Sequence, residues 1–211
     1  MPPILSIHEQ RVLGCLLEKE ILTPDSYPLT LNSLRLACNQ KTSREPVLDL
    51  EEGEVSAALN SLKGRDLVSA RMDGRAARYL HSLEKVAALS QAQRAILTLL
   101  LLRGPQTAGE LRGRGERLHE FQSPAEAEEA LEYLVGLPGG SWVARLSRRP
   151  GEKEARWAQR LDGDVAESEV RQAQDQDRLA GLERRIVDLE REVAAMRFFI
   201  QNHPGEGHAG P

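Results

Sequence analysis

The chain has 211 residues, of which 40% are hydrophobic and 28% charged, which is enough apolar sequence to bury a core in one large or two small domains. No apolar run reaches the roughly 18 residues that a membrane-spanning helix needs, and the N-terminus MPPILSIHEQ lacks the basic and apolar regions of a signal peptide, so we expect a cytoplasmic protein without a membrane partner. The net charge of −4 and the pI near 5.8 argue against strong non-specific affinity for nucleic acid, so any such binding would have to use a local basic patch.

The same order of elements occurs twice, over residues 1–82 and again over residues 83–163. Each copy opens with a capping box, a serine followed three residues later by Glu or Gln, at Ser6 and at Ser90. In a capping box the two side chains bond the free amides at a helix start, so each copy is predicted to begin with a helix, and the residues that follow are largely apolar. The linker around residues 82–89 is short, and we expect the two domains to be closely coupled.

A second, short helix is predicted in each copy, with an N-cap threonine at Thr30 and Thr107. A third helix follows, acidic at its start and apolar at its end. Both copies then change to an alternating pattern, in which LVSAR and ARYLH flank an Asp-Gly hairpin turn at Asp73 and Gly74, and SWVARL and EARWAQ flank a longer turn. Three helices and a hairpin, twice, predict a mainly α fold with small β-hairpins (α+β) made of two tandem winged helix-turn-helix domains.

Residues 164–202 are predicted to form a coiled-coil helix, because apolar residues recur at alternating spacings of three and four. The charges beside this stripe pair with opposite sign in a parallel dimer, for example Arg185 with Glu190, which favours a homodimer. The alternative is that the helix folds back onto its own domain. The Gly/Pro-rich tail 203–211 is expected to be disordered. The stripe consists of Leu179, Leu182, Ile186, Leu189, Val193, Met196 and Ile200.

The string LACNQKTSREPVLDLEEGEVSAALNSL, preceded by LTPDSYPLTLNSL and by a helix containing EQRVLGCLLEKE, resembles the YceH-like family of uncharacterised bacterial tandem winged-helix proteins. The resemblance runs across essentially the whole chain and is strongest over residues 5–81. It implies the tandem winged-helix fold. It implies no activity, because the family has no established one to transfer to particular positions.

The polar stretch CNQKTSREPV lies where the turn of the first helix-turn-helix is expected, so in a DNA complex it would lie near the phosphate backbone. Lys41 and Arg44 are candidates for phosphate contacts. The amides and hydroxyls beside them, at Asn39, Gln40, Thr42 and Ser43, are candidates for further hydrogen bonds. A structural alternative is that Asn39 ends the second helix in a left-handed conformation, Pro46 fixes an extended exit and Arg44 pairs with Glu45.

The third helices begin with glutamates that would repel DNA, Glu51, Glu52 and Glu54 in the first copy and Glu126, Glu128 and Glu129 in the second. Acidic residues also favour a helix N-terminus for structural reasons. In the first copy Ser56, Asn60 and Lys63 follow the acidic turn and remain candidates for DNA contact.

The predicted hairpins concentrate arginine, and Arg112, Arg114 and Arg117 would extend the same basic stripe. The alternative is that arginine is simply the preferred surface cation in a lysine-poor chain. The hairpin candidates are Arg71, Arg75, Arg78, Arg148 and Arg149.

No catalytic motif is present in the sequence, and the two cysteines, Cys15 and Cys38, fall on apolar positions, so neither an enzyme nor a metal or cofactor site is expected. Two hypotheses remain open. The first is a dimeric DNA-binding transcription regulator, and the second is a protein-interaction scaffold that does not bind DNA, which the acidic third helices suit.

Overall fold

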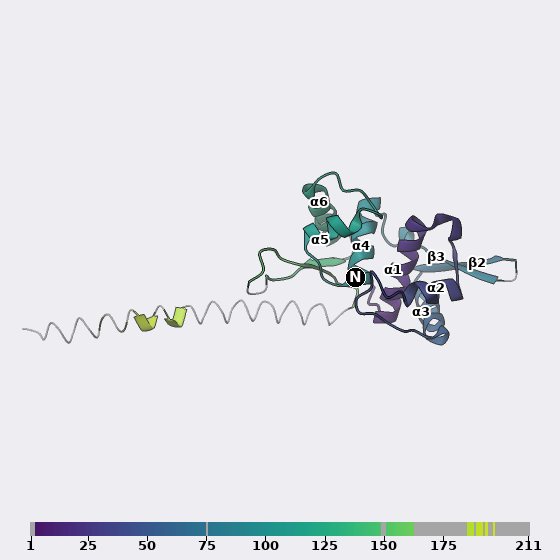
Figure 1. Cartoon of the computed structure of the whole chain (residues 1–211), viewed down its shortest axis with the longest axis horizontal. Helices are drawn as coiled ribbons and strands as arrows, with labels where there is room; N and C mark the ends of the chain where they lie inside the picture. Colours follow the sequence, from purple (N-terminus) through teal and green to yellow (C-terminus); the bar gives the residue numbers. More distant parts are fainter. Residues whose placement is uncertain are drawn as a thin grey trace, which may run out of the picture. The chain divides into compact units, whose positions relative to one another are not determined.

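The computed structural model describes residues 3–74, 76–148 and 151–162, together with 185–187, 189–191, 193 and 196. The chain divides into two compact units, Met1–Val170 and Arg171–Pro211. Figure 1 shows the elements of the first unit in the colours of the sequence. Among the described residues, no helix combines the length and the apolar character that crossing a membrane requires.

The first half of this unit contains three helices and a small sheet. Its elements are α1 (Ile7–Leu22), the 3-10 turn η1 (Pro24–Ser26), β1 (Leu29–Thr30), α2 (Leu31–Cys38), α3 (Glu52–Gly64), β2 (Val68–Asp73) and β3 (Ala76–His81).

The second half repeats this order after the 3-10 turn η2 (Leu83–Lys85). Its elements are α4 (Gln91–Arg103), α5 (Ala108–Gly115), α6 (Pro124–Val135), β4 (Val143–Arg145) and β5 (Trp157–Gln159).

The capping boxes begin α1 and α4, as predicted. Glu9 N donates to Ser6 Oγ over 3.3 Å, and Ser6 N donates to Glu9 Oε2 over 2.6 Å. Ser90 and Gln93 make the equivalent pair of bonds. These local bonds place the first helix of each half at the same point of the repeat.

The predicted hairpins are present in both halves. Strands β2 and β3 are antiparallel around a turn at Gly74, whose φ of 62° favours glycine, and in Figure 1 this hairpin projects beyond the helices. Strands β4 and β5 form a two-stranded antiparallel sheet. The sequence did not predict β1, which pairs antiparallel with β3 and completes a sheet of order β1-β3-β2.

The two halves share one hydrophobic core, and α1 packs against α4 at its centre. Gly14 of α1 permits this close approach, because a Cβ at that position would lie 2.9 Å from Leu102 Cδ2 and 3.2 Å from Leu101 Cβ. Leu5 N also donates a hydrogen bond to Leu161 O, which ties the start of the first half to the end of the second. The halves are therefore repeats in sequence that fold as one body.

In the second unit, the described residues lie in helical turns, and the apolar side chains Ile186, Leu189, Val193 and Met196 are exposed. The other stripe positions, Leu179, Leu182 and Ile200, and the tail 203–211 lie outside the described residues. The coiled-coil dimer and the disordered tail stay predictions.

Candidate functional site

The polar stretch that follows α2 forms a loop that its own side chains hold closed. Asn39 Nδ2 donates to Leu50 O over 2.9 Å, and Leu50 N donates to Asn39 Oδ1 over 2.8 Å. Asn39 has a φ of −93°, so the left-handed ending expected there as one alternative is wrong. The left-handed residue is Ser43, with a φ of 62°. The Asn39 side chain therefore links the two ends of the loop by hydrogen bonds, and Asn39 does not end α2 in a left-handed conformation.

Arg44 is buried beneath this loop, at 5% exposure. Its Nη1 donates to Glu18 Oε1 over 3.0 Å and its Nη2 to Glu18 Oε2 over 2.6 Å. It also bonds Ala37 O at the end of α2 and Gln40 Oε1. The ion-pair partner of Arg44 is thus Glu18 of α1, and the predicted pair with Glu45 is wrong. Arg44 and Gln40 hydrogen-bond to each other on the inner side of the loop, whereas Lys41 and Ser43 are exposed on its outer side.

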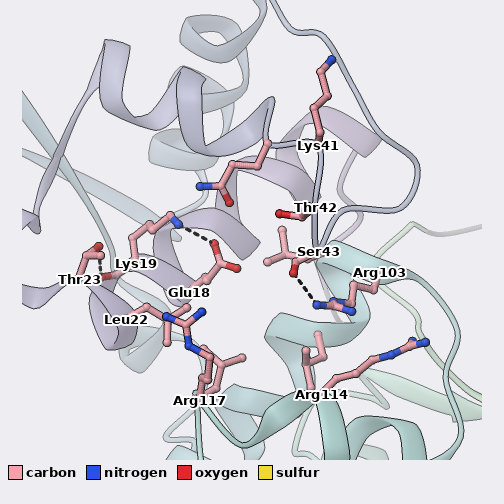
Figure 2. A pocket seen from close by; sticks show the side chains of 14 residues that line it. Glu18, Lys19, Leu22, Thr23, Lys41, Thr42, Ser43, Arg103, Arg114 and Arg117 are labelled. Atoms are coloured by element: carbon pink, nitrogen blue, oxygen red, sulfur yellow. Dashed lines mark hydrogen bonds and ion pairs between the residues drawn. The ribbon is translucent and has the colours of Figure 1, made fainter.

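The outer side of this loop forms one wall of a cleft of about 420 Å³ between the two halves. Helix α1 and the loop line it from the first half, and α4, α5 and the turn after α5 line it from the second half. Figure 2 shows the lining side chains. The cleft exists only because α1 and α4 pack together.

The lining of the cleft is strongly basic. Five cationic side chains line it, against one carboxylate, Glu18. Glu18 is already paired with Arg44 and with Lys19, whose Nζ lies 3.2 Å from Glu18 Oε2. Burial by itself would raise the pKa of Glu18, but the hydrogen bonds and charge of Arg44, with Lys19, hold that pKa below its ordinary value. The five cations are Lys19, Lys41, Arg103, Arg114 and Arg117.

Arg103, the last residue of α4, joins the two walls of the cleft. Its Nη2 donates to Ser43 Oγ over 2.5 Å. Its pKa is lowered, first by burial and then by the positive charges of Arg114 and Arg44, with Glu18 acting in the opposite direction. Arg103 therefore experiences a positive potential that a bound anion would relieve.

The other two arginines come from α5 and the turn that follows it. Arg114 Nη1 donates to Gln106 Oε1 over 2.9 Å, and its Nη2 lies 3.8 Å from Glu110 Oε1. Among the residues that the structure describes, Arg117 has no hydrogen-bond or ion-pair partner from its side chain. In Figure 2, Arg103 and Arg117 reach into the cleft from different sides, whereas Lys41 and Arg114 extend outward from its rim.

Helix α3 holds a second group of predicted residues, away from this cleft. Its buried side is Val55, Ala58, Leu59 and Leu62, as the apolar pattern of the third helix predicts. Its outward line consists of small or uncharged residues, all exposed: Gly53, Ala57, Asn60 and Gly64. Lys63 is exposed beside this line.

The described hairpin arginines differ in whether other groups of the protein already bind them. Arg71 on β2 and Arg148 after β4 are exposed, whereas Arg78 Nε donates to Asp73 Oδ2 over 2.6 Å and its Nη1 to Pro28 O over 3.1 Å. Arg75 and Arg149 lie outside the described residues. The predicted contact residues therefore lie on separate surfaces, namely the loop, α3 and the hairpins.

Sequence reasoning missed Glu18, Lys19 and Arg103 as parts of a site. In the sequence, each is a charged residue near the end of a predicted helix, and nothing distinguishes it from a surface charge. For Lys19 and Arg103 such a position is common, because cations favour helix C-termini. No sequence signal brings Arg103 to Ser43, which is 60 residues away along the chain. Cys15 and Cys38 are fully buried, as expected. Within the described residues, no group of three His, Cys, Asp or Glu side chains is placed to hold a metal ion.

These features define an α+β protein with a repeated three-helix-and-hairpin unit, a shared core and a basic cleft between the repeats. The chain belongs to the family described as "Protein of unknown function, DUF480", whose model matches residues 5–152. It is 43% identical over 218 residues to a UPF0502 protein of Pelobacter propionicus, covering 98% of this chain and 99% of that protein. It is 42% identical over 199 residues to the UPF0502 protein YceH of Salmonella paratyphi B, covering 92% and 93%. The resemblance to the YceH-like family is confirmed.

Proposed function

We propose that the protein is a tandem winged-helix DNA-binding protein, a dimeric transcription regulator whose first half contacts DNA through α3 and the β2–β3 hairpin. The observation that carries this proposal is the outward line of α3. Its members, Gly53, Ala57, Asn60 and Gly64, are all exposed, and an added Cβ at Gly53 or Gly64 would meet nothing within 4 Å. A helix without bulky side chains on its outward line can enter a DNA groove closely.

The glutamates at the start of α3 oppose DNA binding less than the sequence suggests. Glu54 Oε2 accepts a hydrogen bond from Glu51 N over 2.8 Å, so this carboxylate caps its own helix. Lys63 on α3 and Arg71 on the hairpin are exposed cations that would contact phosphates on either side of the groove.

The C-terminal helix would supply the dimer. Ile186, Leu189, Val193 and Met196 carry the predicted stripe and are exposed in the single chain. A parallel coiled coil through this stripe would present two copies of α3 to two half-sites on one duplex.

A second candidate function, docking of a protein partner, is favoured by the surface of α6. This helix exposes Glu128, Glu129 and Glu132, and Tyr133 beside them is 46% exposed. The acidic face repels DNA, and tyrosine is among the residues that are enriched at protein interfaces. The second half would then bind a protein while the first half binds DNA.

The experiment that tests DNA binding is fluorescence anisotropy with fragmented genomic DNA across a salt series, followed by sequencing of the retained fragments. Binding should weaken linearly in a log-log plot against salt, because phosphate contacts release counterions. Asn60→Trp places bulk on the outward line of α3 and should abolish binding. Glu132→Trp places the same bulk on α6 and should leave DNA binding intact.

The variants also separate the two candidate functions. Arg71→Gln should weaken binding to all fragments and reduce the salt slope by about one, whereas Lys85→Gln in η2 should not. If the wild-type protein fails to bind DNA at low salt, or if Asn60→Trp binds as the wild type does, the DNA proposal is wrong. If a protein partner binds the wild type and the other variants but not Glu132→Trp, the protein-docking function is supported.

A further inference from the structure

We propose that the basic cleft between the two halves is a binding site for a small phosphorylated organic molecule. This site is separate from α3 and the β2–β3 hairpin, and the proposal does not depend on DNA binding. It follows from the charge, the hydrogen-bond donors, the size and the position of the cleft.

The cleft is positively charged, whereas the whole protein carries a net negative charge. The chain carries a net charge of −4, yet the cleft is lined by five cations and a single carboxylate, Glu18. Lys19 is paired with Glu18 and Arg114 with Glu110, which leaves Lys41, Arg103 and Arg117 without a carboxylate partner among the described residues. Bringing like charges together in a half-enclosed space is unfavourable unless an anion occupies it. The lowered pKa of Arg103, caused by burial and by the neighbouring arginines Arg114 and Arg44, reflects the same unfavourable field.

The donors of the cleft suit a phosphate group. Arg103 and Arg117 reach inward from different sides, and the planar guanidinium offers paired N–H donors that match phosphate oxygens. Arg117 has no partner among the described residues, and Arg103 is held only by the neutral hydroxyl of Ser43. Thr42 lines the cleft beside Ser43 and supplies another hydroxyl. Two arginines and two hydroxyls therefore line the cleft as donors for phosphate oxygens.

The remaining lining suits the organic part of a ligand. Leu22, Leu99, Leu102 and Leu118 contribute apolar surface next to the cations. The volume of about 420 Å³ lies within the range of about 300 to 1,000 Å³ that is typical of small-molecule sites. An inorganic anion would leave most of this space and the leucines unused, so we commit to a phosphorylated molecule of the size of a mononucleotide or a sugar phosphate.

The position of the cleft gives the ligand a structural effect. Lys41, Thr42 and Ser43 belong to the first half, and Arg103, Arg114 and Arg117 belong to the second. A ligand held by both halves stabilises their packing, because it binds the folded arrangement and not the unfolded chain. Binding should therefore raise the melting temperature of the protein.

The test measures binding of four probes to the full chain by isothermal titration calorimetry, with the melting temperature as a second readout. The probes are pyrophosphate, AMP, ATP and glucose 6-phosphate. At least one organic phosphate should bind with a dissociation constant below about 1 mM, more tightly than pyrophosphate, and should raise the melting temperature.

Three arginine variants form a matched set. Arg103→Gln and Arg117→Gln should each weaken that binding about tenfold, the loss expected for one charge-assisted hydrogen bond to phosphate. Arg112→Gln is the control, because Arg112 is an exposed arginine of α5 that does not line the cleft. It should change the dissociation constant less than about twofold.

Two results would overturn the proposal. One is that none of the four probes binds below about 1 mM, and the other is that Arg112→Gln weakens binding as much as Arg117→Gln. If no small probe binds but Arg117→Gln weakens binding of a duplex oligonucleotide, the phosphates that occupy the cleft are those of DNA, and the small-ligand site is refuted. The Asn60→Trp variant keeps the outcomes distinct, since it should abolish DNA binding and leave the cleft unchanged.

Discussion

Glu18 of α1 and Arg44 of the loop after α2 form a buried ion pair with two parallel hydrogen bonds, of 3.0 and 2.6 Å. The pair fastens the polar loop onto the helix that also packs against α4. Because Lys41, Thr42 and Ser43 stand on this loop, the ion pair sets the position of one wall of the cleft. The stability of the first half and the geometry of the candidate site therefore depend on the same contact.

Arg44→Met should destabilise the protein strongly. It leaves the buried carboxylate of Glu18 without its main partner, which costs about 3 kcal/mol of unfolding free energy, near the low end for such a change because Lys19 also contacts Glu18. Urea denaturation followed by circular dichroism measures the difference. Arg112→Gln, at an exposed site, should stay within about 0.5 kcal/mol of the wild type, and an equally small effect of Arg44→Met would show that the ion pair contributes nothing.

The contribution of Glu18 should depend on pH with a definite sign. Its pKa in the folded protein lies below the ordinary value of 4.5, because the bonds to Arg44 outweigh the opposing effect of burial. The stabilisation is therefore complete above about pH 4.5 and is lost as the pH falls through the lowered pKa. The difference in unfolding free energy between the wild type and Glu18→Gln should narrow as the pH is lowered from about 7 to about 3. A difference that stays constant over this range would contradict the assignment.

The packing of α1 on α4 should be sensitive to Gly14. Gly14→Val adds atoms that meet Leu101 and Leu102 and should cost about 1 to 3 kcal/mol, as overpacking does. Gly113→Val is the matched control, because Gly113 is an exposed glycine of α5 with nothing within 4 Å of an added Cβ. It should be neutral or slightly stabilising, since valine has a higher helix propensity than glycine. Equal melting temperatures for the two variants would contradict the close approach.

Ile186→Asp combined with Val193→Asp should convert a dimer into a monomer. Both side chains belong to the predicted a positions, and an aspartate there would bury an unpaired charge in the helix interface. Light scattering coupled to gel filtration reports the mass. Arg191→Asp, on the opposite side of the predicted heptad, should keep the dimer mass. A wild-type monomer, or a double variant of unchanged mass, would refute the coiled-coil dimer.

Features encoded by neighbouring residues were predictable from the sequence. The capping boxes at Ser6 and Ser90, the N-caps at Thr30 and Thr107 and the turn at Gly74 all lie where the sequence places them. Strand β1 was missed, because two residues carry no measurable periodicity and their pairing partner β3 is distant in sequence. The left-handed ending at Asn39, one of two alternatives, was wrong, and the bonds of Asn39 to Leu50 were not predicted, since Leu50 lies across a loop whose shape the sequence does not give.

The sequence by itself determined the order of the elements and the repeat, because caps, turns and apolar periods act through hydrogen bonds and side chains only a few residues apart. Only the tertiary structure decided which charges meet. Lys41 and Arg117 are ordinary surface cations in the sequence, and Arg44 reads as one as well. The loop after α2 folds Arg44 onto Glu18 of α1, and the packing of α1 against α4 gathers Lys41, Arg103 and Arg117 around one cleft. Electrostatic fields depend on distances through space, and those distances arise only when segments far apart in the chain share a core.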